Sequence, residues 1–247
     1  MLDLSPPRKL TPDSSLPDVD IAAIEQALSV HGLLSRGWFN LAASARLPAP
    51  FDGCCSVVLV GNAGGSFWPT FSSWLQKHPG SDHPLDTWSK AVLEPIASAF
   101  EATAVFPSDG PPYMPFQQWA KAAEPVFDSP LKVLVHHSYG PWHAYRGALL
   151  FGRPIADVEP TVTASSPCRS CRDSPCLRTC PVNAFDGDNF AMQDCAAELS
   201  RQQVSGNAPC LDSGCIARKA CPVGQNFYYP EAQMRFHTLA FLRSRKS

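Results

Sequence analysis

The chain has 247 residues, 45% of them hydrophobic, and a formal net charge of −2 at pH 7. This length accommodates one large domain or two modest ones, and the hydrophobic share is normal for a globular core. The small net charge argues against general nucleic-acid binding, and the lack of a long apolar run argues against a membrane-spanning helix.

The N-terminal part predicts an arm, a helix and a strand. Residues 1–17 are polar and contain prolines, which is typical of an extended arm. A helix is predicted from Asp18 or Asp20 to about Val30, and a strand is predicted to begin near Gly37. Because the first residues lack a basic-then-apolar export signal, we expect a reducing, cytoplasmic location.

The clearest buried strand is Cys55–Gly61, a run of small and β-branched residues that leads into a glycine-containing loop ending at Gly65. The loop matches neither the dinucleotide-binding fingerprint nor the P-loop. Two interpretations remain open, a tight strand-to-helix turn and a loop that faces a ligand. Cys54 and Cys55 have no partner motif and are expected to be core thiols.

The middle of the chain predicts alternating helices and strands. One apolar helical face surrounds Phe71, and another runs from Leu85 to Phe100, where Pro95 is expected to kink or split the helix. The further predicted elements are a strand at 103–107, a helix at Phe116–Ala123, strands at Leu131–His136 and Ala144–Phe151, a linker at 152–166 and a last helix at Glu231–Leu242.

Eight of the ten cysteines lie between residues 167 and 223. The first half of this stretch reads C-x2-C-x4-C-x3-C-P and closes at Cys180-Pro181. The second half is looser, C-x4-C-x5-C-P, and closes at Cys221-Pro222. A cysteine followed by proline ends the cluster-binding run of bacterial ferredoxins, which this stretch resembles.

The ferredoxin rule divides these cysteines into two sets. A [4Fe–4S] cluster takes four thiolates, one for each iron, and in two-cluster ferredoxins the Cys-Pro cysteine of one half ligates the other cluster. The first predicted set is Cys168, Cys171, Cys176 and Cys221. The second predicted set is Cys180, Cys195, Cys210 and Cys215. Disulfides, a zinc site and a single cluster with spare cysteines remain as alternatives.

Residues Leu131–Pro160 resemble the corresponding stretch of CblC-type cobalamin-processing proteins. The matching residues are His136, Gly140, Trp142, Arg146 and Gly147. Weaker matches run from His31 to Asn40 and over Asp82-His83-Pro84. The resemblance implies an α+β, nitroreductase-like domain at 18–151, a sheet wrapped by helices, that binds cobalamin.

The same resemblance implies four cofactor-binding candidates, Arg146, Trp142, His83 and His136. Each also has a structural interpretation: a strand arginine paired with a carboxylate, a packed core tryptophan, a cap or turn histidine at His83, and a histidine at a strand end at His136. In place of the family's later C-terminal segment, this chain has the ferredoxin-like module at 167–225 and a C-terminal helix at 226–247. Thiol-dependent removal of the upper cobalamin ligand is therefore not implied.

Epoxyqueuosine reductases are a second family that the chain resembles, because they join a corrinoid-binding domain of this fold to a two-cluster module with a similar cysteine order. Their downstream helical repeats have no counterpart here, since the chain ends soon after Cys221. Action on tRNA is therefore the weaker expectation, although an enzyme of this type remains an alternative.

The expected function is that of an iron–sulfur oxidoreductase that passes electrons from two [4Fe–4S] clusters to a bound corrinoid. The clusters would be loaded by an external donor, such as ferredoxin, flavodoxin or a flavin reductase, and a corrinoid or a small molecule would be the substrate. The alternatives are a plain electron carrier with a docking domain, and a flavin in place of the corrinoid.

The two parts of the chain carry opposite charge, −5 for residues 1–166 and +3 for residues 167–247. Opposite charge favours docking of the two parts on each other. We therefore expect Trp142 and Arg146 to line one cavity whose wall includes cluster-binding loops.

Overall fold

The computed structural model describes residues 18–42, 47–156 and 164–245. The predicted arm at 1–17 and residues 157–163 of the predicted linker lie outside the described residues. Among the described helices, each is too short or too polar to cross a lipid bilayer.

The chain forms two compact units, and neither is one continuous segment. The first unit consists of the described parts of Met1–Asn62, Pro69–Glu124 and Ala144–Val162. The second consists of the described parts of Ala63–Trp68, Pro125–His143 and Thr163–Ser247. The sequence-based division, with one domain at 18–151 and a module after it, differs from this arrangement, because residues 63–68 and 125–143 pack with the cysteine-bearing segment.

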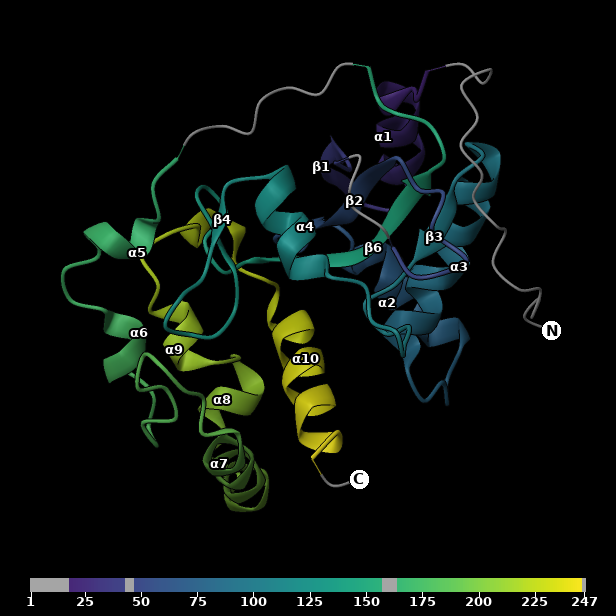
Figure 1. Cartoon of the computed structure of the whole chain (residues 1–247). Coiled ribbons are helices and arrows are strands. Elements are labelled where there is room, and N and C mark those ends of the chain that lie inside the picture. Colours follow the sequence, from purple (N-terminus) through teal and green to yellow (C-terminus); the bar gives the residue numbers. More distant parts are fainter. Residues whose placement is uncertain (1–17, 43–46, 157–163, 246–247) are drawn as a thin grey trace. The chain divides into compact units, whose positions relative to one another are not determined.

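The first unit is built on a four-stranded sheet (Figure 1). The strand order is β1 (Leu34–Asn40), β2 (Ser56–Ala63), β6 (His143–Phe151) and β3 (Thr103–Val105). The β1 strand is antiparallel to β2, with an irregular register between Ser35 and Trp38, and β3 is antiparallel to β6. Every residue of β2 is buried, as its run of small and β-branched residues predicts.

Four helices surround this sheet, α1 (Ile21–Ser29), α2 (Trp68–Lys77), α3 (Pro84–Ala99) and α4 (Phe116–Ala123). The α1 and α4 helices pack against β1, and α3 packs against β3. The Asp20 carboxylate caps α1 by accepting a hydrogen bond from the Ala23 N–H, at 2.9 Å. Pro95 lies inside α3 without dividing it. Phe71 and Trp88 meet edge to face at 5.6 Å, so both predicted apolar faces enter the core.

The second unit consists mainly of short helices. They are α5 (Pro167–Ser170), α6 (Pro175–Arg178), α7 (Met192–Ser205), α8 (Pro209–Asp212), α9 (Ile216–Lys219), the 3₁₀ turn η1 (Gln225–Phe227) and α10 (Glu231–Arg243). The α10 helix packs against α7 and α8, and α6 packs against α9 (Figure 1). Proline begins three of the four-residue helices, which fits its fixed backbone angle at a first helical position.

The strand predicted at Leu131–His136 is shorter than expected. Only Val135–His136 is extended, as β5, and it pairs antiparallel with β4 (Val126–Phe127). The residues before β5 form a turn, in which Lys132 has a positive φ of 57° and its N–H donates to the Ser129 carbonyl at 3.0 Å. The Ser129 hydroxyl closes the turn by donating to the Val133 carbonyl, at 2.7 Å. These local bonds replace the ladder that a longer strand would have needed.

Candidate functional site

The first predicted cysteine set lines one small cavity in the second unit. Cys168 lies on α5, Cys171 caps its end, Cys176 lies on α6, and Cys221 follows α9. All four thiols border a cavity of about 30 Å³. Cys221 therefore joins three cysteines that precede it by 45 to 53 residues, as in the crossed pattern of a two-cluster ferredoxin.

The second predicted set lines another, larger cavity of the same unit. Cys180 follows α6, Cys195 lies on α7, Cys210 lies on α8, and Cys215 precedes α9. These four thiols border a cavity of about 220 Å³. The structure thus brings the eight cysteines together in the two sets of four that the sequence predicts.

Where the pKa of a thiol in these sets is shifted by other thiols, those thiols belong to its own set. The pKa of Cys195 is raised to about 12, first by burial and then by the charges of Cys215, Cys180 and Cys210. Burial also raises the pKa of Cys168, and its neighbours in the first set add to the shift. Four thiolates in such a cavity are unfavourable without a compensating cation, and metal binding would release their protons.

None of the ten cysteines, all of which lie in the described ranges, forms a disulfide. The disulfide alternative therefore has no counterpart in the structure. Between residues 18 and 245, apart from the two undescribed gaps, no three His, Cys, Asp or Glu side chains are arranged to hold a single metal ion. Cys54 and Cys55 lie half-buried before β2 and not in the core, where they were expected. Burial raises the pKa of Cys54 to about 12.

Trp142 is packed in the second unit. Its ring is 1% exposed and contacts Tyr228 and Tyr229, with ring centroids 4.7 Å and 5.4 Å away. The guanidinium carbon of Arg218 lies 4.7 Å from the centroid of the same ring. Trp142 borders the larger cavity, as do Arg218 and Tyr229. The sequence reasoning missed Arg218 and Tyr229, although Arg218 stands between two predicted ligands, in the C-x5-C interval.

Arg146 is half-buried on β6, and its Nε donates to the side-chain oxygen of Asn62 at 3.2 Å. The structural interpretation expected a carboxylate partner for Arg146, and in this hydrogen bond the partner is the side-chain amide of Asn62. Arg146 borders neither of the two four-cysteine cavities, whereas Trp142 borders the larger one. The predicted cavity shared by Trp142 and Arg146 is therefore not either of these two.

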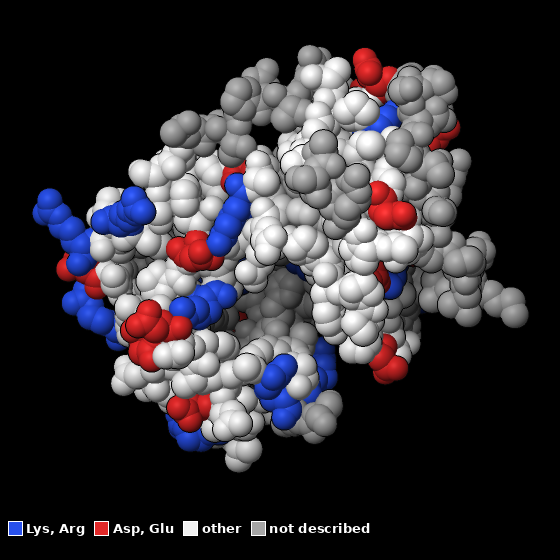
Figure 2. Space-filling view, viewed as in Figure 1, with Lys and Arg blue, Asp and Glu red and all other residues white. Residues whose placement is uncertain are grey.

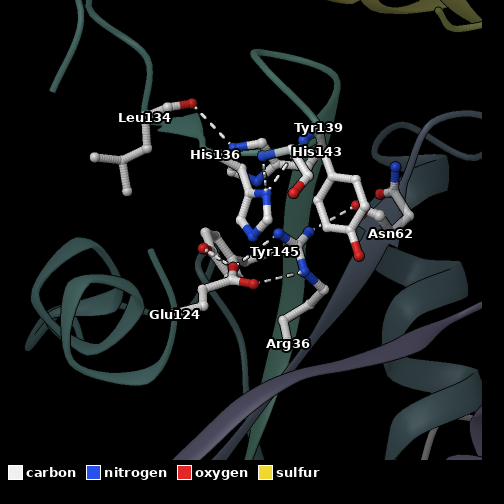
Figure 3. A network of polar contacts seen from close by, with 9 residues as sticks. Arg36, Asn62, Glu124, Leu134, His136, Tyr139, His143 and Tyr145 are labelled. Carbon is white, nitrogen blue, oxygen red and sulfur yellow. Dashed lines mark hydrogen bonds and ion pairs between the residues drawn. The ribbon is translucent and has the colours of Figure 1, made fainter. Parts of the chain in front are cut away.

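The two candidate histidines hold different positions. His136 is 8% exposed, and its Nδ1 accepts hydrogen bonds from the backbone N–H groups of Ser138 and Tyr139, at 3.0 and 3.1 Å. Its ring also stacks on Tyr139 at 4.2 Å (Figure 3). These bonds give His136 a structural role in the turn after β5. His83 is exposed at the N-cap position of α3, and its side chain makes no capping bond. Cofactor binding by Arg146, Trp142, His83 and His136 stays a prediction.

A buried charge network in the first unit escaped the sequence reasoning. Arg36 on β1 forms an ion pair with Glu124, at 2.7 Å, and donates to the Asn62 carbonyl at 2.8 Å (Figure 3). The Tyr145 hydroxyl donates to the same carboxylate. Burial raises the pKa of Glu124, and the charge of Arg36 opposes that shift. Arg36 and Glu124 are 88 residues apart, so no local sequence signal links them.

No protein-family model matches the sequence, and neither does any curated protein. Among solved structures, the fold is similar to that of a B12-trafficking protein, CblC from C. elegans, which is a homologue of human MMACHC. The match has a TM-score of 0.50 at 16% identity and covers 90% of this chain and 94% of the other. The likeness shows a shared fold and confirms the predicted mixed helix-and-sheet class at that level.

Two epoxyqueuosine reductases show weaker structural similarity. One has a TM-score of 0.46 at 15% identity, covering 87% of this chain and 68% of its own. The enzyme from Bacillus subtilis has a TM-score of 0.49 at 13% identity, covering 86% of this chain and 68% of its own. The comparison of folds therefore rests on the CblC structure.

Proposed function

We propose that this chain is an iron–sulfur electron-transfer protein that holds two [4Fe–4S] clusters in its second unit. The observation that carries the proposal is the grouping of eight cysteines around two separate cavities, four to each. When bound, the clusters would supply one-electron transfer, and the burial and hydrogen bonding of their ligands would set their potentials.

The donor set fits clusters better than single ions. Four thiolates on one zinc ion would lie about 4 Å apart, given Zn–S bonds of about 2.3 Å, whereas each thiolate of a cluster binds a different iron. Each cysteine set shares one cavity, and each set includes the Cys-Pro cysteine of the other half of the segment. This combination supports clusters over the zinc alternative.

A corrinoid is the proposed electron acceptor, supported by the fold shared with a B12-trafficking protein. Both cysteine cavities, of about 220 and 30 Å³, are smaller than the pockets of roughly 300–1,000 Å³ that hold drug-sized ligands, and a corrinoid is larger than such ligands. The corrinoid would need a site outside these two cavities. A flavin acceptor is the alternative within this proposal.

The proposed electron donor is an acidic protein such as a ferredoxin or a flavodoxin. Arg169, Arg172 and Arg178 are exposed close in sequence to ligands of the first set. Figure 2 shows basic side chains gathered over α5 and α6. A positive surface beside the first cluster would attract an acidic donor and speed its encounter.

A plain electron carrier is the second candidate. Every cysteine of both sets lies in the second unit, so the cluster sites do not require residues of the first. A carrier needs only these sites, whereas a corrinoid-dependent protein also needs a corrinoid site.

Anaerobic reconstitution followed by metal and sulfide analysis tests the proposal. We expect about eight iron and eight sulfide per chain. About four of each would leave a single cluster, and zinc with little iron would overturn the proposal.

Anaerobic titration with cobalamin then separates the two candidate functions. Saturable changes in the visible spectrum, followed by cobalt reduction after the clusters are reduced, would support the corrinoid acceptor. If the protein binds cobalamin no more tightly than serum albumin does but still reduces a redox dye, the corrinoid acceptor is wrong. The plain electron carrier is then the remaining function.

A further inference from the structure

The two four-cysteine cavities differ in the polarity of their walls. Besides its cysteines, the smaller cavity is bordered by prolines, valines and one serine, Ser174, with no charged side chain among the described lining residues. The larger cavity has six polar or charged side chains in its wall besides the cysteines, Trp142, Glu198, Arg218, Tyr229, His237 and Thr238. We call Trp142, Arg218 and Tyr229 the donor wall.

Arg218 is held rigidly in the donor wall. Its Nε donates to the Pro141 carbonyl at 3.1 Å, and its Nη2 donates to the same oxygen. Its guanidinium carbon lies 4.7 Å from the ring centroids of both Trp142 and Tyr229. An arginine between two aromatic faces and a carbonyl is a fixed cation. It follows Cys215, a ligand of the second set, by one helical turn of α9.

Both aromatic members of the wall have a polar atom without a partner. The Trp142 indole nitrogen and the Tyr229 hydroxyl are buried, and neither has a hydrogen-bond partner among the described residues. A buried donor left unpaired destabilises the folded state, so such atoms normally have an acceptor. Sulfur atoms of a cluster in the cavity that these side chains border would supply one.

One anionic group borders the same cavity and opposes the donor wall. The Glu198 carboxylate accepts hydrogen bonds from Arg201 at 2.6 Å and from Gln202 at 2.7 Å. Those bonds lower the pKa of Glu198 and keep it ionised. The positive charge of Arg201 compensates the negative charge of Glu198. Glu198 is therefore neutralised more than Arg218 is.

We propose that the donor wall makes the second cluster, held by Cys180, Cys195, Cys210 and Cys215, more easily reduced than the first. The inference rests on the proposed two-cluster function. Reduction adds one negative charge to a cluster, and a fixed cation with hydrogen-bond donors stabilises that charge. One electron from a low-potential donor such as reduced ferredoxin would enter the first cluster and leave it for the second. No bond is formed or broken in that transfer, and no proton moves.

Redox titration of the anaerobic holoprotein, monitored by electron paramagnetic resonance, tests the inference. The native protein should show two steps, and a Cys221→Ser variant should retain the step at higher potential. Arg218→Gln should make the second cluster about tenfold harder to reduce, a fall of about 59 mV for one electron. Arg218→Lys should give a smaller fall, and Tyr229→Phe should shift the same step in the same direction.

Arg178→Gln is the matched control. Arg178 also lies between two cysteine ligands, Cys176 and Cys180, but its side chain is 66% exposed. Solvent screens an exposed charge, so this variant should leave both steps unchanged.

The outcomes separate the inference from the function on which it rests. If Arg218→Gln and Tyr229→Phe each keep about eight iron per chain and show two unshifted reduction steps, the proposed effect of the donor wall is wrong. The two-cluster function would still stand. Equal shifts of both steps would also overturn the proposed effect of the donor wall. If Arg218→Gln loses iron, Tyr229→Phe and Arg218→Lys decide the question. A native protein without iron–sulfur clusters would instead overturn the proposed function.

Discussion

Cys221 follows Cys215 closely in the chain, yet the two thiols border different cavities. The α9 helix lies between them and separates the ends of the two ligand sets. Cys176 and Cys180 are divided in the same way, on either side of the end of α6. At the scale of single residues, the cavity that each thiol borders determines to which of the two sets the cysteine belongs.

Single substitutions should therefore remove different clusters. Cys221→Ser and Cys180→Ser should each reduce the iron content from about eight to about four per chain, because each removes one ligand of a different cluster. The double variant should lose nearly all the iron, and Cys54→Ser should retain about eight. Iron analysis after anaerobic reconstitution measures this. A double variant that still holds about four iron would place both cysteines on one cluster.

The Arg36–Glu124 pair offers a residue-scale test in the first unit. Glu124→Gln removes the charge that compensates a guanidinium only 2% exposed. Removing one partner of a buried ion pair typically costs about 3–5 kcal/mol, because the other charge stays buried. Urea unfolding of the holoprotein, followed by circular dichroism, measures the loss.

Lys90→Met is the control for this test. Lys90 pairs with Asp109 at 2.7 Å, but both side chains are more than a third exposed, at 38% and 39%. Such a pair should be worth less than about 1 kcal/mol. Equal losses in the two variants would show that the buried network does not stabilise the first unit as inferred.

At the scale of elements, four helices of the second unit are only four residues long, α5, α6, α8 and α9. Helices this short are unstable in isolation, because ordering the first turn costs more free energy than its hydrogen bond contributes. Each of them carries a predicted cluster ligand or adjoins one. The clusters would thus hold together elements that their own hydrogen bonds cannot hold.

Removing iron should consequently loosen these helices. After treatment with a chelator and an oxidant, amides in 167–221 should exchange with deuterium much faster, whereas β2 and β6 of the first unit should keep their protection. Exchange measured by mass spectrometry with and without clusters tests this. Equal loss of protection in both units would mean that the clusters stabilise the whole chain.

A close backbone approach links the turn after β5 to the end of the cysteine segment. Gly140 has a φ of 57°, and a Cβ on it would overlap the Val223 carbonyl. Gly140→Ala should therefore destabilise the second unit by more than the roughly 1–2 kcal/mol of a left-handed residue alone, and should weaken iron retention by the first set. Unfolding free energy and iron content after dialysis measure both effects.

Gly206→Ala provides the comparison, because Gly206 also has a positive φ, of 74°, but a Cβ added there would meet no atom within 4 Å. This variant should show only the backbone cost and keep its iron. If Gly140→Ala and Gly206→Ala lose the same unfolding free energy and the same iron, the contact of Gly140 with Val223 does not contribute to stability.

At the scale of the whole molecule, the uneven charge of the chain bears on its partners. Exposed arginines accompany the first cysteine set, whereas residues 1–166 carry the negative balance of −5. An acidic electron donor should thus react fastest at low salt, since screening shortens the range of attraction.

Stopped-flow reduction by an acidic ferredoxin tests the docking proposal. The bimolecular rate should fall about tenfold from low to high ionic strength, and Arg172→Glu should slow it at low salt. Lys77→Glu, the same charge change on α2 of the first unit, should have little effect. A rate independent of salt and of Arg172 would place donor docking elsewhere.

The features that depend on local spacing were predictable from the sequence. The strand predicted at Cys55–Gly61 follows from its run of small and β-branched residues, and the structure has it at 56–63. Capping chemistry left Asp18 and Asp20 as alternatives, and the structure places Asp20 at the cap of α1. The Cys-Pro rule predicts the same two sets of cysteines that border the two cavities. The first two of these features depend on neighbouring residues, and the third depends on the spacing of the cysteines.

Contacts between residues far apart in the chain could be identified only in the folded molecule. The pairing of Arg36 with Glu124, the packing of 125–143 with the cysteine segment and the donor wall around Arg218 each join separate stretches. No periodic pattern encodes such contacts, because they depend on which surfaces meet when apolar faces are buried. Burial also determined that Trp142 packs against Tyr229 and Arg218, since an isolated tryptophan in a sequence is equally compatible with a core and with a binding site.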